Sequence, residues 1–126
     1  MRIAMAFLLA VAAGLPASGQ SMSPMRGEVT SFADAFAVRV YPANPYDHRI
    51  RVEVRVYDQD FAPVAAQIQP PEFTLGGQAS RPVLVIVPFD GAVSRKVRIC
   101  TESVPFPGRQ TQIRAQICGK FLARRI

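Results

Sequence analysis

Two cysteines, Cys100 and Cys118, lie on either side of a Pro-Phe-Pro-Gly segment. Thiols pair into disulfides in oxidising compartments, and closing a loop of about 19 residues stabilises a domain by about 3 kcal/mol. A redox pair normally has a Cys-X-X-Cys spacing, which is not found here. Two thiols are also too few for a structural zinc site. The sequence therefore predicts a structural Cys100–Cys118 disulfide and no metal site.

Few residues could perform acid–base or nucleophilic catalysis. His48 is the only histidine and follows Asp47 in a Pro-Tyr-Asp-His turn, with no serine in a recognisable nucleophile context. Asp58 and Asp60 form a carboxylate pair, but no further ligand or acid identifies a site, so solvated charges are the simpler interpretation. The sequence predicts that the protein is not an enzyme and uses no cofactor.

The formal net charge is +6, and the basic residues, mostly arginine, are spread along the chain. Nucleic-acid binding is disfavoured because no basic stretch is interleaved with base-stacking aromatic residues. An anionic envelope surface or a carboxylate-bearing partner fits this charge better.

The N-terminus has the pattern of a secretion signal. Arg2 precedes a mainly apolar run from Ile3 to Leu15, and Ala17-Ser18-Gly19 supplies small residues for cleavage. The run is shorter than a membrane-spanning helix, so stable membrane insertion is the minor alternative. We predict a signal peptide at 1–19, a single domain at 20–126 and export of the mature chain.

Alternating apolar and polar residues predict an all-β protein. We expect about seven short strands and an immunoglobulin-like β-sandwich, with a β-barrel as the alternative. The unbroken apolar run 83–87 is either a strand covered on both faces or an exposed apolar edge. The expected strands lie near 25–29, 34–41, 49–58, 64–69, 73–75 and 83–87, and in the hairpin 95–125.

One register of the hairpin places the two cysteines opposite each other and also keeps the apolar residues of both strands on one face. If Cys100 is opposite Cys118, Arg98 faces Lys120 on the same side of the sheet. The other side then carries a set of apolar residues that forms one edge of the core: Val97, Ile99, Ile113, Ala115, Ile117 and Phe121.

Four segments resemble the N-terminal domain of periplasmic pilus chaperones of the usher pathway, the PapD-like proteins, here as a single stand-alone domain. They are Ser23-Pro24-Met25-Arg26, Asn44-Pro45 before Arg51-Val52-Glu53-Val54, the segment from Pro70 to Gln78, and Gly119-Lys120-Phe121-Leu122-Ala123-Arg124. The resemblance covers nearly all of the predicted mature chain and, with the export signal, implies a periplasmic location.

The resemblance implies specific roles for residues. Arg26 and Lys120 would anchor the C-terminal carboxylate of a client protein. Thr111, Ile113 and Ala115 would lie on the strand that pairs with the client by strand addition. A homodimer that replaces a second domain is an open alternative.

These observations lead to one principal expectation and one rival. The first is an exported, chaperone-like protein that binds an extended segment of an envelope or pilus-type protein by edge-strand pairing. The rival is a structural or adaptor module of the cell envelope with no client-folding role. Fold alone does not decide between them.

Overall fold

The computed structural model describes residues 21–104 and 115–126, which form strands joined by turns and loops. The predicted signal at 1–19 lies outside the described residues. The described strands are β1 (Ser21–Ser23), β2 (Arg26–Ser31), β3 (Ala35–Ala43), β4 (Ile50–Asp58), β5 (Gln67–Gln69), β6 (Glu72–Leu75), β7 (Val83–Pro88), β8 (Ser94–Val104) and β9 (Ala115–Arg125).

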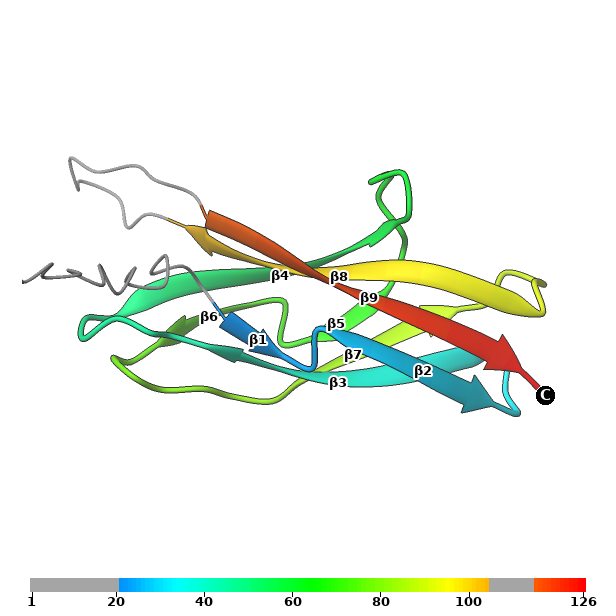
Figure 1. The fold of residues 1–126 in the computed structure, drawn as a ribbon, viewed down its shortest axis with the longest axis horizontal. Coiled ribbons are helices and arrows are strands. Elements are labelled where there is room, and N and C mark those ends of the chain that lie inside the picture. Colours follow the sequence, from blue (N-terminus) through cyan, green and yellow to red (C-terminus); the bar gives the residue numbers. More distant parts are fainter. Residues whose placement is uncertain (1–20, 105–114) are drawn as a thin grey trace, which may run out of the picture.

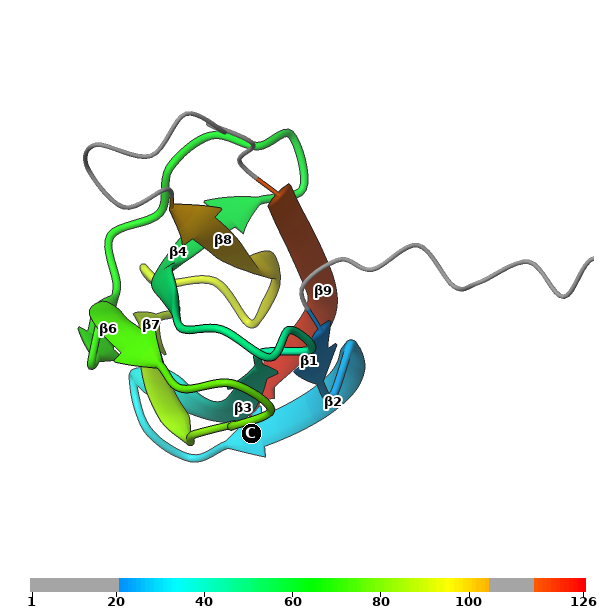
Figure 2. The same cartoon turned by 90° about the vertical axis from the view of Figure 1, so that its left-hand side faces the viewer.

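The strands form two sheets that pack face to face (Figures 1 and 2). One sheet has the order β1-β3-β7-β5 and the other has the order β2-β9-β8-β4-β6. In the part of the chain that the structure describes, no helix is long and apolar enough to cross a membrane. The predicted all-β sandwich is confirmed.

The core lies between the sheets and is built from alternate residues of the longest strands. Val52, Val54 and Val56 of β4 are buried, whereas Arg55 between them is exposed. This is the period-two pattern of a strand with one face in the core. In the facing sheet the rings of Phe36 and Phe89 pack with centroids 5.0 Å apart. The apolar run 83–87 is neither fully covered nor an edge, because β7 lies between β3 and β5 with Leu84 and Ile86 half-buried.

The expected strand near 25–29 corresponds to β2, but a short strand that sequence patterning does not reveal, β1, precedes it and belongs to the other sheet. β1 pairs antiparallel with β3, Met22 lying opposite Pro42. The chain then crosses to the other sheet, where β2 pairs parallel with β9. The unpredicted strand β1 is one reason why the described residues contain nine strands and not about seven. Pro42 also lies within β3, which continues to Ala43, two residues beyond the end of the strand predicted at 34–41.

The hairpin register agrees with the prediction. Cys100 lies opposite Cys118, Arg98 opposite Lys120 and Glu102 opposite Gln116. The hairpin does not lie at the edge of its sheet, because β9 also pairs with β2 and β8 also pairs with β4. These two flanking strands bring residues from distant parts of the sequence to the outer face of the hairpin.

Asn44 joins the turn after β3 to the turn after β6. Its side chain is 2% exposed, and its Nδ2 donates hydrogen bonds to the carbonyl oxygens of His48 (2.7 Å) and Gly76 (3.0 Å). Its Oδ1 accepts a bond of 2.9 Å from the Tyr46 backbone N–H. The turns approach so closely that a Cβ on Gly77 would lie 2.4 Å from the Asp47 carbonyl oxygen.

We expect Asn44→Ala to lower the free energy of unfolding by about 2 kcal/mol, because it leaves buried backbone groups without partners. Urea unfolding followed by circular dichroism measures this loss. Gln67→Ala, which shortens an exposed side chain of β5, is the matched control and should change stability by no more than about 0.5 kcal/mol. Equal losses in the two variants would show that the hydrogen bonds of Asn44 do not hold the turns together.

Candidate functional site

The structure places Arg26 directly opposite Lys120. β2 and β9 are parallel neighbours, and their register begins with this pair. Both residues are exposed. Two cations proposed from segments far apart in sequence are therefore adjacent on one surface.

Phe121 and two glycines set this pairing. The Phe121 side chain is 3% exposed and packs into the core beneath β2 and β9. A Cβ on Gly27 would lie 3.1 Å from the Phe121 ring, and a Cβ on Gly119 would lie 2.8 Å from it. The glycines therefore let the ring lie close to both strands. The Lys120 backbone N–H also donates a 2.9 Å hydrogen bond to the Met25 carbonyl, just before β2 begins.

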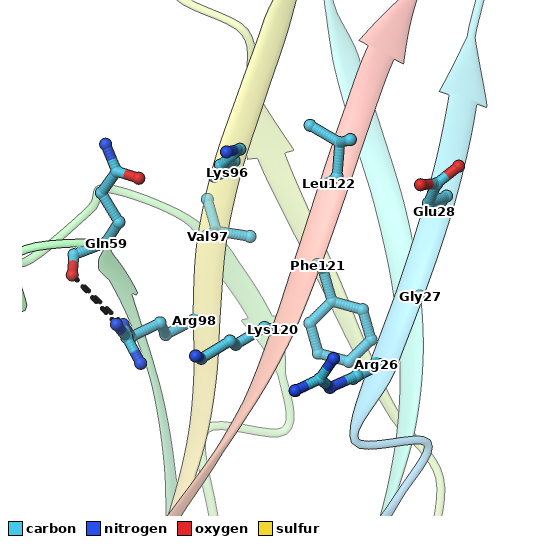
Figure 3. A pocket seen from close by; sticks show the side chains of 10 residues that line it. All are labelled: Arg26, Gly27, Glu28, Gln59, Lys96, Val97, Arg98, Lys120, Phe121 and Leu122. Carbon is cyan, nitrogen blue, oxygen red and sulfur yellow. Dashed lines mark hydrogen bonds between the residues drawn. The ribbon is translucent and has the colours of Figure 1, made fainter.

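A groove of about 530 Å³ lies over β2, β9 and β8 (Figure 3). Of the residues that line it, four are cations and only one, Glu28, is an acid. None of the four cations forms an ion pair with another described residue. The lining residues are Arg26, Gly27, Glu28, Gln59, Lys96, Val97, Arg98, Lys120, Phe121 and Leu122. Such a groove suits an anionic ligand.

Arg98 is a site residue that the sequence analysis did not select. Arg98 lies in β8, opposite Lys120 of β9. Its Nε and Nη2 donate hydrogen bonds of 3.3 Å and 3.2 Å to the Gln59 carbonyl oxygen. The hairpin register already placed it beside Lys120, which is the signal that could have identified it. A prediction of the carboxylate anchor that also covered the strand paired with Lys120 would have selected Arg98.

Asp58, which was interpreted as a solvated charge, has a structural role. Its Oδ1 accepts hydrogen bonds from the backbone N–H groups of Asp60 (2.8 Å) and Ala62 (2.9 Å). These bonds hold the turn that presents the Gln59 carbonyl to Arg98. The carboxylate is thus a partly exposed charge, as predicted, and it also stabilises a turn, which the sequence did not indicate.

One side of β9 is open before the anchoring lysine. β8 pairs with β9 from Ala115 onward, whereas β2 pairs with it only from Lys120. Among the described residues, no strand pairs with 115–119 on the side away from β8. Ala115 lies at the start of this open stretch and is half-buried, and Ile117 packs against the core. Thr111 and Ile113, the other two residues expected to pair with a client, lie outside the described residues.

The predicted disulfide is present. The Cys100 and Cys118 sulfur atoms are 2.00 Å apart, in the cross-strand pair two residues along from Arg98 and Lys120. The bond joins β8 to the open part of β9. It therefore holds together the two strands that carry Arg98 and Lys120.

The remaining candidates for chemistry are separate from this groove. His48 is exposed in its turn, and its ring stacks on Tyr46 with centroids 5.1 Å apart. In residues 21–104 and 115–126, no three histidine, cysteine, aspartate or glutamate side chains are grouped to hold a metal ion.

Comparison with known proteins gives structural matches only. No family model and no curated protein matches the sequence. The E. coli chaperone DraB matches with a TM-score of 0.67 and 22% identity, over 85% of this chain and 55% of its own. The Salmonella enterica chaperone SafB, solved with the SafA pilin, matches with a TM-score of 0.68 and 20% identity. This match covers 85% of this chain and 54% of the SafB chain.

A PapD-like domain of human CEP192 also matches, with a TM-score of 0.63 and 10% identity, over 100% of this chain and 98% of that one. The chain thus spans about half the length of the two bacterial chaperones and the whole length of the human domain. At these identities the matches establish the fold. The chain has the PapD-like, immunoglobulin-like β-sandwich fold found in periplasmic pilus chaperones.

Proposed function

We propose that the protein is an exported, chaperone-like protein that binds an extended segment of an envelope or pilus-type protein. In this proposal Arg26 and Lys120 hold the C-terminal carboxylate of the client, and the open side of β9 pairs with its backbone. The observation that carries the proposal is the register of Arg26 opposite Lys120 in a groove rich in cations. The similarity to SafB, which was solved with a pilin, supports the class of partner.

The groove suits a carboxylate for chemical reasons. An arginine guanidinium and a lysine ammonium on adjacent strands can both donate charge-assisted hydrogen bonds to one carboxylate. The side of β9 at 115–119 that pairs with no described strand can extend the sheet with a client strand. Strand addition requires an extended partner, and the pair of cations requires that this partner has a free C-terminus. A periplasmic location follows from the export signal expected at 1–19 and fits the chaperone fold.

The test uses a fluorescent peptide of alternating valine and serine that ends in glutamine, prepared as the free acid and as the amide. Fluorescence anisotropy should show that the wild-type protein binds the free acid about tenfold more tightly. Arg26→Glu, Lys120→Glu should remove this preference, because two anions then face the carboxylate. Binding of the free acid should also weaken as salt is added.

The control variant is Arg39→Glu, Arg49→Glu, which makes the same change in net charge at two exposed residues outside the groove. It should keep the preference for the free acid, and circular dichroism should show that both variants are folded. If amidation has no effect on wild-type binding, the carboxylate anchor is wrong.

An adaptor module is the second candidate function. The observation that favours it is the match along the whole of a single PapD-like domain of human CEP192. An adaptor would bind a folded or internal segment of its partner. Its binding should be indifferent to amidation of a C-terminus, so the same peptide pair separates the two functions.

A further inference from the structure

Arg98 extends the proposed anchor into a row of three cations on three adjacent strands. Arg26 on β2 lies opposite Lys120 on β9, and Lys120 lies opposite Arg98 on β8. Figure 3 shows the three side chains on the same face, with Lys120 extending from β9 toward the strand that carries Arg98. Neighbouring strands are about 4.8 Å apart, so the row spans about 10 Å.

The position of Arg98 is fixed by the loop between β4 and β5. Its guanidinium lies 4.4 Å from the centre of the Phe61 ring and donates to the Gln59 carbonyl. Phe61 is held with a positive φ of 61° in the turn that Asp58 stabilises, and its side chain is half exposed. A cation that already has a carbonyl and an aromatic partner loses little conformational freedom when a ligand binds.

The row carries more positive charge than one carboxylate can neutralise. Like charges directly opposite each other destabilise a sheet, and this row has two such pairs. Lys96 adds a fourth cation to the groove, and Glu28 is the one acid in its lining. A client carboxylate held by Arg26 and Lys120 leaves Arg98 and Lys96 without an anion.

We propose that Arg98 makes this site selective for clients whose last residue is glutamate or aspartate. The α-carboxylate would bind between Arg26 and Lys120, and the side-chain carboxylate would bind between Lys120 and Arg98. The two carboxylates of a C-terminal glutamate are separated by about one strand spacing, which matches adjacent gaps in the row. This inference rests on the proposed carboxylate anchor and specifies which C-terminus it accepts.

The test compares two fluorescent valine–serine peptides, one ending in glutamate and one ending in glutamine, each prepared as the free acid and as the C-terminal amide. Wild-type protein should bind the glutamate peptide about fivefold more tightly in fluorescence anisotropy, the size expected of a partly exposed ion pair. Arg98→Gln should bind the two peptides with equal affinity, so that the ratio of the two dissociation constants falls to about one. Arg39→Gln removes the same charge from β3 and should keep the fivefold preference.

Each other outcome contradicts a defined part of the inference. Equal binding of the two peptides by wild-type protein, with amidation still weakening both, would leave the carboxylate anchor intact and overturn the role of Arg98. An Arg98→Gln variant that is folded by circular dichroism and keeps the preference would also overturn that role. If neither peptide responds to amidation, both the inference and the proposed function fail.

Discussion

Phe121→Ala is expected to lower the free energy of unfolding by about 3–5 kcal/mol, the cost of removing a buried phenylalanine and leaving a cavity. The ring is 3% exposed and lies in the core. It also lies against Gly27 of β2 and Gly119 of β9, positions where a Cβ would crowd it. Removing the ring therefore weakens the contact between the two strands that carry the proposed anchor.

Urea unfolding measures the global loss, and amide hydrogen exchange measures where it occurs. We expect β2 to exchange faster relative to β4 in the variant, because β2 loses its packing against β9 whereas β4 pairs with β6 and β8. Leu122→Ala is the control, since Leu122 is a half-buried neighbour whose truncation should cost about 1 kcal/mol. Equal destabilisation by the two variants would contradict the role given to the ring.

Alternation and the cysteine pair were sufficient to predict the centre of the fold. The register of the hairpin depends on a period of two on both strands, and one shift by a residue would have turned Phe121 to solvent. The same alternation predicted β4, whose valines are buried. These features are local, or depend on a single pairing, so sequence patterns contain the information.

The parts that were missed depend on tertiary placement. Nothing in the sequence around Pro24 shows that the chain passes from one sheet to the other there. β1 pairs with β3 and β2 pairs with β9, and β9 is distant in sequence. Arg98 could have been selected from the hairpin register, which places it opposite Lys120. Its contacts with Gln59 and Phe61 could not, because their loop reaches β8 only in the folded sheet.

The cations that would bind a client are also expected to destabilise the sheet that carries them. Arg98, Lys120 and Arg26 repel one another across two strand pairs, which weakens the pairing of β9 on both sides. The disulfide beside them and the buried Phe121 beneath them hold the same strands together. We infer that these two features allow the fold to tolerate the repulsion. A bound carboxylate would relieve it.

Cys100→Ala, Cys118→Ala is expected to lower the free energy of unfolding by about 3 kcal/mol, because the disulfide restricts the unfolded chain by closing a loop with a sequence separation of 18. The urea midpoint should fall by about 2 M. The apolar face of the hairpin is unchanged, so the register and the binding of the glutamine peptide should persist below the unfolding transition. Reduced wild-type protein is the control and should unfold with the variant. Coincident transitions of the oxidised protein and the variant would show that the bond does not stabilise the domain.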